Sequence, residues 1–122
     1  MKALTVSFSL KGQNVSSIIK QLKKLQKKFN GDDVLLIHSK LPRGEIKMRK
    51  MSTELVDKIY ELFPIQLNLW KEDTGSLIHE MGYFAKMLNA SVYVIGRIDE
   101  HVSKEISYYK LYNLEINYIE LK

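Results

Sequence analysis

Two carboxylates, Asp73 and Glu80, stand seven positions apart in the segment DTGSLIHEMGYFA, residues 73–85. On a helix, seven residues return almost to the same side, so the two side chains would project in similar directions. Two carboxylates at a cleft can act as nucleophile and proton donor, which is the arrangement used to cleave glycosidic bonds. The alternative is structural, because acids favour the first turn of a helix through its dipole. The segment therefore predicts either a catalytic helix start or the opening turns of a core helix.

Other kinds of chemistry are excluded or disfavoured by residue type and spacing. The chain has no Cys, which excludes disulfides, thiolate catalysis and Cys-ligated zinc. The sequence contains no phosphate-loop motif, dinucleotide fingerprint or G-x-S-x-G elbow, which argues against an ordinary ATPase, dehydrogenase or serine hydrolase. The three histidines, His38, His79 and His101, lie in separate segments without metal-like spacing. Neither a metal nor a cofactor is predicted.

The elements that must position Asp73 and Glu80 follow from hydrophobic periodicity. Five apolar segments rich in β-branched or aromatic residues alternate with four segments of helical spacing. This alternation with short connections predicts an α/β fold: one small doubly wound, flavodoxin- or Rossmann-like domain over residues 1–122. The domain would hold a five-stranded, mostly parallel sheet and about four helices. Strands are predicted at 3–10, 34–38, 65–70, 91–96 and 114–121, and helices at 15–29, at 53–63, from the 73–85 segment onward, and at 100–113.

Ligands of such sheets bind beyond the carboxyl ends of the strands, where the strand order reverses. Trp70 at this edge could stack on a nucleobase, although a Trp at a strand end is often a core or interface residue. Several further candidates for binding follow from the predicted strand ends: Ser7 and Ser9 at the first strand, His38 and Ser39 at the second, 70–75 at the third, and 96–101, with Gly96, Arg97 and His101, at the fourth.

Positive charge is concentrated in the first part of the chain. The net charge is +5, with +9 on residues 1–50 and −4 on residues 51–122. Such a basic half suits nucleic acid, a phosphate-bearing ligand or an acidic partner, while the alternative is a solvated lysine-rich helix face. Arg43 belongs to a basic loop after the second strand. It could pair with a phosphate, which would favour a nucleotide over a free nucleoside.

The segment DTGSLIHEMGYFAKMLNASVYVIG, residues 73–96, resembles the nucleoside 2-deoxyribosyltransferase family and the related deoxynucleotide N-glycosidases. The resemblance implies that Glu80 is the nucleophile toward the anomeric carbon of the sugar and that Asp73 positions or protonates the base. It also implies that Gly75 forms the turn that admits the ligand, that Gly82 allows close helix packing, and that Tyr83 is the family's aromatic residue. Composite sites in that family imply a homo-oligomer.

Residues 96–121 resemble the last unit of small Rossmann-like nucleotide-binding proteins related to that family, which often occur in phages and mobile elements. Three functions are therefore open. The first is a nucleoside- or nucleotide-binding protein with deoxyribosyltransferase or N-glycosidase activity at Glu80. The second is a non-catalytic module that binds or sequesters a nucleotide or signalling nucleotide. The third, an interaction protein that uses its basic half on nucleic acid or an acidic protein, is the least favoured.

No stretch of the sequence is typical of a signal peptide or a bilayer-spanning helix. We therefore expect a cytoplasmic protein that does not associate with a membrane.

Overall fold

The computed structural model describes residues 2–9, 13–39, 50–69 and 74–121, with residues 38, 39, 50–53, 68, 69 and 74–79 described by their backbone alone. Within these ranges, five parallel strands form one sheet in the order β3-β2-β1-β4-β5. The strands are β1 (Lys2–Phe8), β2 (Val34–Ser39), β3 (Gln66–Leu69), β4 (Ser91–Ile95) and β5 (Ile116–Ile119). The helices are α1 (Val15–Phe29), α3 (Lys50–Leu62), α4 (Thr74–Met87) and α5 (Glu100–Leu111), with a short 3-10 helix, η1 (Gly31–Asp33), before β2.

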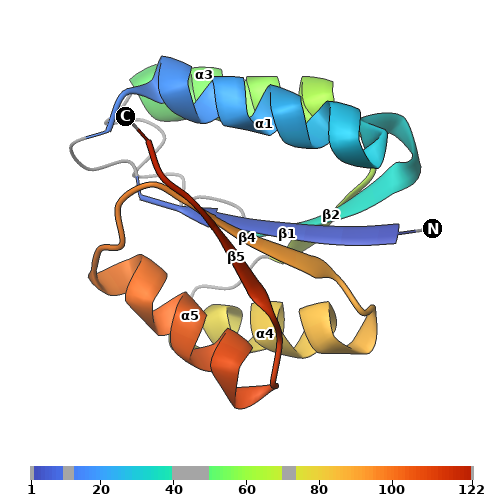
Figure 1. The fold of residues 1–122 in the computed structure, drawn as a ribbon, viewed down its shortest axis with the longest axis vertical. Helices are drawn as coiled ribbons and strands as arrows, with labels where there is room; N and C mark the ends of the chain where they lie inside the picture. The colour runs from blue at the N-terminus through green and yellow to red at the C-terminus, as the bar shows by residue number, and fades with distance from the viewer. Residues whose placement is uncertain (1, 10–12, 40–49, 70–73, 122) are drawn as a thin grey trace.

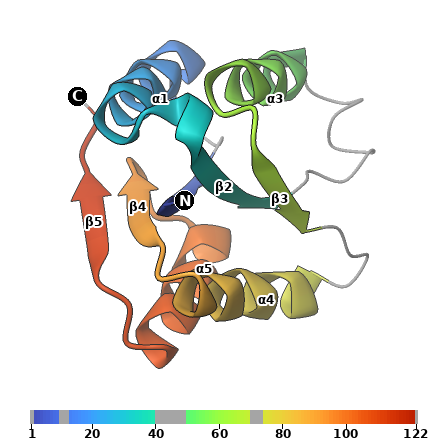
Figure 2. The ribbon, with the colours of Figure 1, turned by 90° about the vertical axis from the view of Figure 1, so that its right-hand side faces the viewer.

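The predicted fold class is confirmed. Helices α1 and α3 cover one face of the sheet, and α4 and α5 cover the other (Figures 1 and 2). The strand order is that of a Rossmann sheet, in which the chain leaves β1 toward one face and leaves β4 toward the other. Among the described residues, no helix has the length and apolar character needed to cross a bilayer.

Local sequence signals explain where α1 begins and ends. Asn14 precedes the helix, and its side chain accepts a hydrogen bond from the Ser16 backbone N–H at 2.8 Å, which is the usual N-cap contact. At the other end, Asn30 has a left-handed backbone conformation with φ of 55°, a role that Asn fills when Gly does not. The helix predicted over 15–29 is confirmed at both ends.

The largest differences from the predicted boundaries lie at α3 and β5. Helix α3 begins at Lys50, three residues before the predicted start, in a stretch without a strong N-cap signal. Strand β5 covers only Ile116–Ile119, because it is an edge strand that pairs with β4 alone. The 3-10 helix η1 was not predicted.

Strand β1 separates two different interiors. Leu4 and Val6 point into an apolar core beneath α1 and α3 that also includes Leu22 and Phe63. Alternate residues of a strand point to opposite faces, so Ala3, Thr5 and Ser7 face α4 and α5. Strand β1 is therefore apolar on one face and largely polar on the other, which is unusual for the central strand of a parallel sheet.

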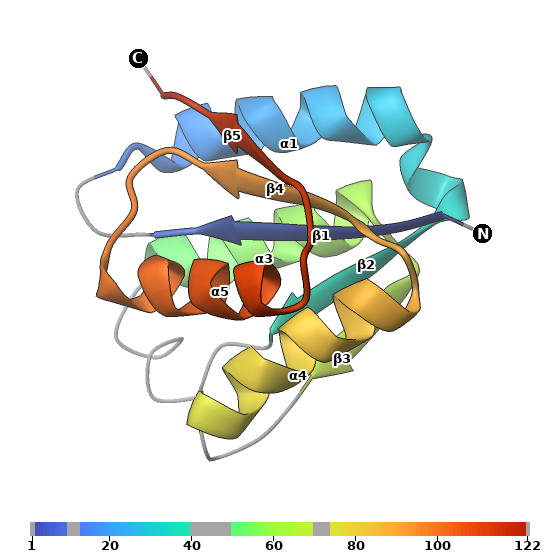
Figure 3. The ribbon, with the colours of Figure 1, turned by 60° about the horizontal axis from the view of Figure 1, so that its bottom comes forward.

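The point where the strand order reverses lies between β1 and β4, which are hydrogen-bonded neighbours. Helices α1 and α5 both begin at the edge of the sheet where these two strands end (Figure 3). In open α/β sheets this edge carries the ligand crevice. We call the space between Ser9, Gln13 and Asn14, on the side of β1, and residues 96–99, which follow β4, the crevice.

Candidate ligand site at the carboxyl edge of the sheet

The side chain of Gln13 joins the two segments that border the crevice. Its Nε2 donates a hydrogen bond to the Ser9 carbonyl oxygen. Its Oε1 accepts one from the Arg97 backbone N–H at 2.5 Å. One amide thus satisfies a backbone acceptor after β1 and a backbone donor after β4. This contact fixes the two segments relative to each other.

Gly96 allows Gln13 to come this close. Its φ is +72°, a conformation that residues with a Cβ rarely adopt. A Cβ at this position would overlap Gln13 Oε1 and lie 2.8 Å from Leu121 Cδ1. The Gly96 backbone N–H also donates to the Ile119 carbonyl at 2.7 Å, which ties the end of β4 to β5. The glycine is therefore required by its backbone angle, and a Cβ would also displace the ends of the Gln13 and Leu121 side chains.

A cavity of about 500 Å³ opens beside Gly96, above the carboxyl ends of β4 and β5. Its size falls within the range of small-molecule sites. The first turn of α1 forms one wall and carries no acidic residue, so the positive end of the helix dipole is not neutralised there. Arg97 adds a cation and Glu120 an anion. The lining residues are Gln13, Asn14, Ser17, Gly96, Arg97, Glu120 and Leu121.

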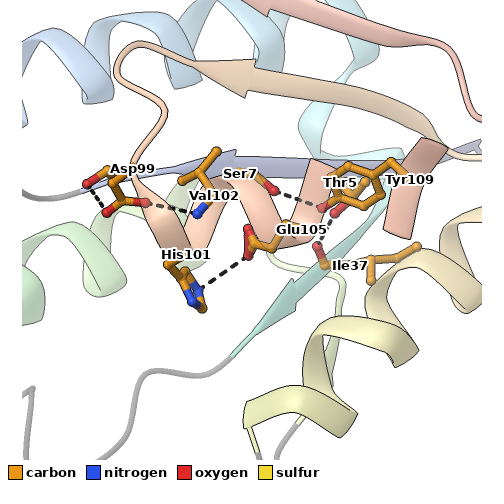
Figure 4. Close-up of polar contacts among 9 residues, drawn as sticks. Thr5, Ser7, Ile37, Asp99, His101, Val102, Glu105 and Tyr109 are labelled. Carbon is orange, nitrogen blue, oxygen red and sulfur yellow. Dashed lines mark hydrogen bonds and ion pairs between the residues drawn. The ribbon is translucent and has the colours of Figure 1, made fainter. Parts of the chain in front are cut away.

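On the opposite face of the sheet, three hydroxyl-bearing residues, Thr5, Ser7 and Ser9, follow one another at alternate positions of the chain. We call them the hydroxyl row. All are buried, with exposed fractions of 0%, 3% and 4%. Thr5 Oγ1 donates to the Ile37 carbonyl at 3.1 Å, and Ser7 Oγ lies 2.8 Å from the Tyr109 hydroxyl. Figure 4 shows Thr5 and Ser7 beside Tyr109 in the interior, and Ser9 extends the row to Asp99 after β4.

The outer end of the hydroxyl row is held by the N-cap of α5. Ser9 Oγ donates to Asp99 Oδ2 at 2.6 Å, while the Val102 backbone N–H donates to Asp99 Oδ1 at 2.8 Å. Asp99 therefore caps α5 and at the same time binds the segment after β1. This carboxylate connects the crevice to the buried polar residues of α5.

Glu105 is a buried carboxylate at the centre of this polar group, with 4% of its surface exposed. Burial raises the pKa of Glu105 to about 7; a hydrogen bond from Ser7 opposes the shift, and the negative charge of Asp99 adds to it. Its Oε1 lies 3.5 Å from His101 Nε2. Among the described residues, its Oε2 has no hydrogen-bond partner. Figure 4 shows the carboxylate between Ser7 and His101.

Tyr109 closes the inner end of the polar group and is fully buried. Burial raises the pKa of its phenol well above the ordinary value, and the nearby Glu105 carboxylate raises it further. Tyr109 therefore remains protonated at physiological pH and serves as a neutral hydrogen-bonding partner of Ser7.

The structure brings four of the predicted site residues, Ser9, Gly96, Arg97 and His101, to the edge where β1 and β4 end, and it places a fifth, Ser7, in the interior beside them. Ser7, Ser9 and His101 lie on the face covered by α5, each in contact with Tyr109, Asp99 or Glu105. Gly96 and Arg97 line the cavity on the α1 side. Ser7 lies within β1 rather than after it, so it is part of the interior.

The remaining predicted residues lie on other elements or outside the described residues. Glu80 is half-buried in the second turn of α4. Tyr83 packs edge-on against Phe84 and Tyr112, with ring centroids 5.4 and 6.4 Å apart. Since Tyr112 follows the end of α5 and Asp99 precedes its start, Tyr83 lies at the opposite end of α5 from the Ser9–Asp99 contact.

His38 lies in β2, next to β1, and Gly75 is the second residue of α4, but both are described by their backbone alone. Asp73, Arg43 and Trp70 lie outside the described residues. The prediction that Gly82 permits close helix packing is confirmed, because a Cβ there would lie 3.1 Å from Tyr112 Cδ2 and 3.2 Å from Tyr108 Cβ.

Gln13, Glu105 and Tyr109 are among the residues of the site that were not predicted. For Glu105 a signal exists in the sequence, because it follows Val102 by three positions and precedes Tyr109 by four. That spacing places it on the stripe of α5 that is buried. Gln13 carries no comparable signal, since its role depends on the adjacency of β1 and β4.

No protein-family model matches this chain, and no curated protein matches it. Solved structures do share its fold. A universal stress protein from Archaeoglobus fulgidus, solved in complex with dAMP, superposes with a TM-score of 0.52 at 11% identity, over 100% of this chain and 98% of that one. A dodecameric FMN-dependent UbiX-like decarboxylase from Escherichia coli O157:H7 gives a TM-score of 0.46 at 12% identity, over 93% of this chain and 77% of the other. At such identities, the likeness to the universal stress protein shows the α/β doubly wound fold alone.

Proposed function

We propose that this protein binds a nucleotide at the crevice, with the phosphate group held at the first turn of α1 and beside Arg97. The observation that carries the proposal is the cavity of about 500 Å³ at the switch point between β1 and β4. A helix N-terminus and an arginine both favour a phosphate, and the surplus of basic residues in the first part of the chain agrees with an anionic ligand.

The likeness to the universal stress protein adds support, because that protein shares the fold over the full length of this chain and was solved with dAMP. The walls of the cavity carry both polar and apolar surface, which suits a ligand that combines polar ribose and phosphate groups with a base. A non-catalytic binding or sequestering role requires no residue beyond those already described at the crevice.

The phosphate contact predicts the effect of removing Arg97. We expect dAMP to bind more tightly than deoxyadenosine, and Arg97→Ala to weaken dAMP binding about tenfold, which corresponds to about 1.4 kcal/mol. Isothermal titration calorimetry at low salt measures both affinities. Lys86→Ala removes an exposed cation on α4 and should leave the affinity unchanged. Equal binding of dAMP and deoxyadenosine would rule out the phosphate contact.

A second, catalytic function is proposed on the resemblance of residues 73–96 to the deoxyribosyltransferases. Helix α4, which carries Glu80, begins after the carboxyl end of β3, at the same edge of the sheet as the crevice. In this mechanism the Glu80 carboxylate attacks C1′ of the sugar, the bond to the base breaks, and water or a second base then takes the sugar from the enzyme.

Release of free base tests the catalytic function directly. Wild-type protein incubated with 2′-deoxynucleosides and their 5′-monophosphates should release base, and Glu80→Gln should lower the rate at least a hundredfold, because the nucleophile is lost. Chromatography of the products gives the rate, and Glu115→Gln, the same change at an exposed site, is the control. Base release that persists in Glu80→Gln would assign the activity to another residue. Nucleotide binding without any release would leave the non-catalytic function alone.

A further inference from the structure

An unpaired carboxylate oxygen in the interior calls for a physical explanation. Glu105 Oε2 is buried and has no hydrogen-bond partner in the described part of the chain. A buried carboxylate with an unpaired oxygen is strongly destabilised relative to the neutral acid, because the charge loses its hydration. Protonation of Glu105 removes most of this penalty, so the geometry favours the neutral acid at this position.

The groups around Glu105 act in both directions, because burial and the Asp99 charge favour the proton while the hydrogen bond from Ser7 opposes it. At the start of its own helix, the N-cap Asp99 carboxylate repels a second negative charge, and His101 lies 3.5 Å from Oε1 and is half-exposed. Further along the helix, the buried phenol of Tyr109 interacts with the Glu105 carboxylate. Strand β1 contributes only the neutral hydroxyls of Ser7 and Thr5. Strands β4 and β5 pack apolar side chains, Val94 and Ile116, against this helix. Helix α4 carries, among its described side chains, the titratable groups of Glu80, which is half-buried, and of Tyr83 and Lys86, which are exposed.

The crevice and Glu105 are connected through the N-cap of α5. Arg97 lines the cavity, and Asp99, two residues later, is the charge that acts on Glu105. Asp99 also binds Ser9, whose carbonyl accepts from Gln13, another residue of the cavity wall. An anion bound beside Arg97 would therefore add negative potential on the side of Asp99, and negative potential favours a proton on Glu105.

We propose that Glu105 takes up a proton when a phosphate-bearing ligand occupies the crevice, so that ligand binding is coupled to protonation of this carboxylate. The inference rests on the proposed nucleotide-binding function and adds to it a dependence on pH. By linkage, an anionic ligand that favours the protonated state must bind more tightly when the pH is low enough to protonate Glu105.

Calorimetry of dAMP binding at pH 7, in buffers of different ionisation enthalpy, counts the protons exchanged. We expect the wild type to take up roughly 0.3 proton per dAMP more than Glu105→Gln, and its affinity to rise about threefold more than that of the variant between pH 8 and pH 6. The difference between the two proteins is the readout, since the phosphate ester itself titrates near pH 6.

Carbon-13 NMR of the Glu105 carboxyl gives a second measurement that needs the wild type alone. Its titration midpoint should lie near 7 without ligand and move upward with dAMP. A free-protein midpoint near the ordinary glutamate value would overturn the inference, whatever the ligand does. Binding of dAMP with equal proton uptake in both proteins, or with no movement of the midpoint, would overturn the inference but leave nucleotide binding intact. No binding of dAMP would overturn both.

Discussion

We expect the free energy of unfolding of the wild type to fall by about 3 kcal/mol between pH 4.5 and pH 7, and we expect Glu105→Gln to abolish this fall. Burial raises the folded-state pKa of Glu105 to about 7, above the value of 4.5 that it has when unfolded. Between these values the folded protein holds more protons than the unfolded chain, so the free energy of unfolding falls as the pH rises. The stabilisation is complete below pH 4.5 and is lost as the pH rises through about 7.

Urea unfolding at a series of pH values from 4.5 to 8 measures this effect. The glutamine side chain resembles the protonated acid and carries no charge, so the variant should be more stable than the wild type at pH 8 and close to it at pH 4.5. Glu115→Gln, at an exposed site, is the control for the loss of one negative charge. A wild type and a Glu105→Gln protein with parallel pH profiles would show that the Glu105 carboxylate is solvated and not buried.

Gly96→Ala should destabilise the protein by about 2 kcal/mol and abolish ligand binding at the crevice. The backbone φ of +72° is unfavourable for alanine, and the new Cβ would overlap Gln13 Oε1 and approach Leu121. Relief of that overlap requires Gln13 to move, which would break its contacts with Ser9 and Arg97. Thermal unfolding and dAMP titration of the same preparation report the two effects.

Gly82→Ala is the matched control, because it makes the same substitution within helix α4. A Cβ there would meet Tyr108 and Tyr112 at 3.1–3.3 Å, and this crowding opposes the gain in helix propensity of about 1 kcal/mol. We expect a small change in stability and an unchanged affinity for dAMP. If Gly96→Ala bound dAMP as the wild type does, the Gln13 bridge would not be needed to form the site.

The parts of the fold that local patterns determine were predictable from the sequence. Residues 14–31 combine an N-cap asparagine, a regular apolar stripe and a C-terminal Asn-Gly. Strand β2 begins with a continuous apolar run, as expected of a strand buried on both faces. The start of α3 at Lys50 was not predictable, because a polar helix terminus without a cap residue has no distinct pattern.

The candidate site was predictable only where the strand-end rule applies. That rule correctly brings Ser9, Gly96 and His101 to one edge of the sheet. The bridge formed by Gln13 depends on the adjacency of β1 and β4, and adjacency is a long-range property that periodicity does not specify. The importance of Glu105 depends on its depth and on the charge of Asp99, which also arise from tertiary packing.

The two faces of β1 imply that the two layers of the molecule do not share stability equally. Beneath α1 and α3, Leu4 and Val6 join a large apolar core that contains no titratable side chain except that of Tyr93 among its described buried residues. Beneath α4 and α5, the same strand presents hydroxyls to Glu105. The free energy of local opening is lowest where burial stabilises the structure least. Ionisation of Glu105 therefore lowers the free energy of opening α5, whereas α1 keeps its packing. Alkaline conditions therefore act first on one layer, and that layer contains α5, whose N-cap residue Asp99 binds Ser9 after β1.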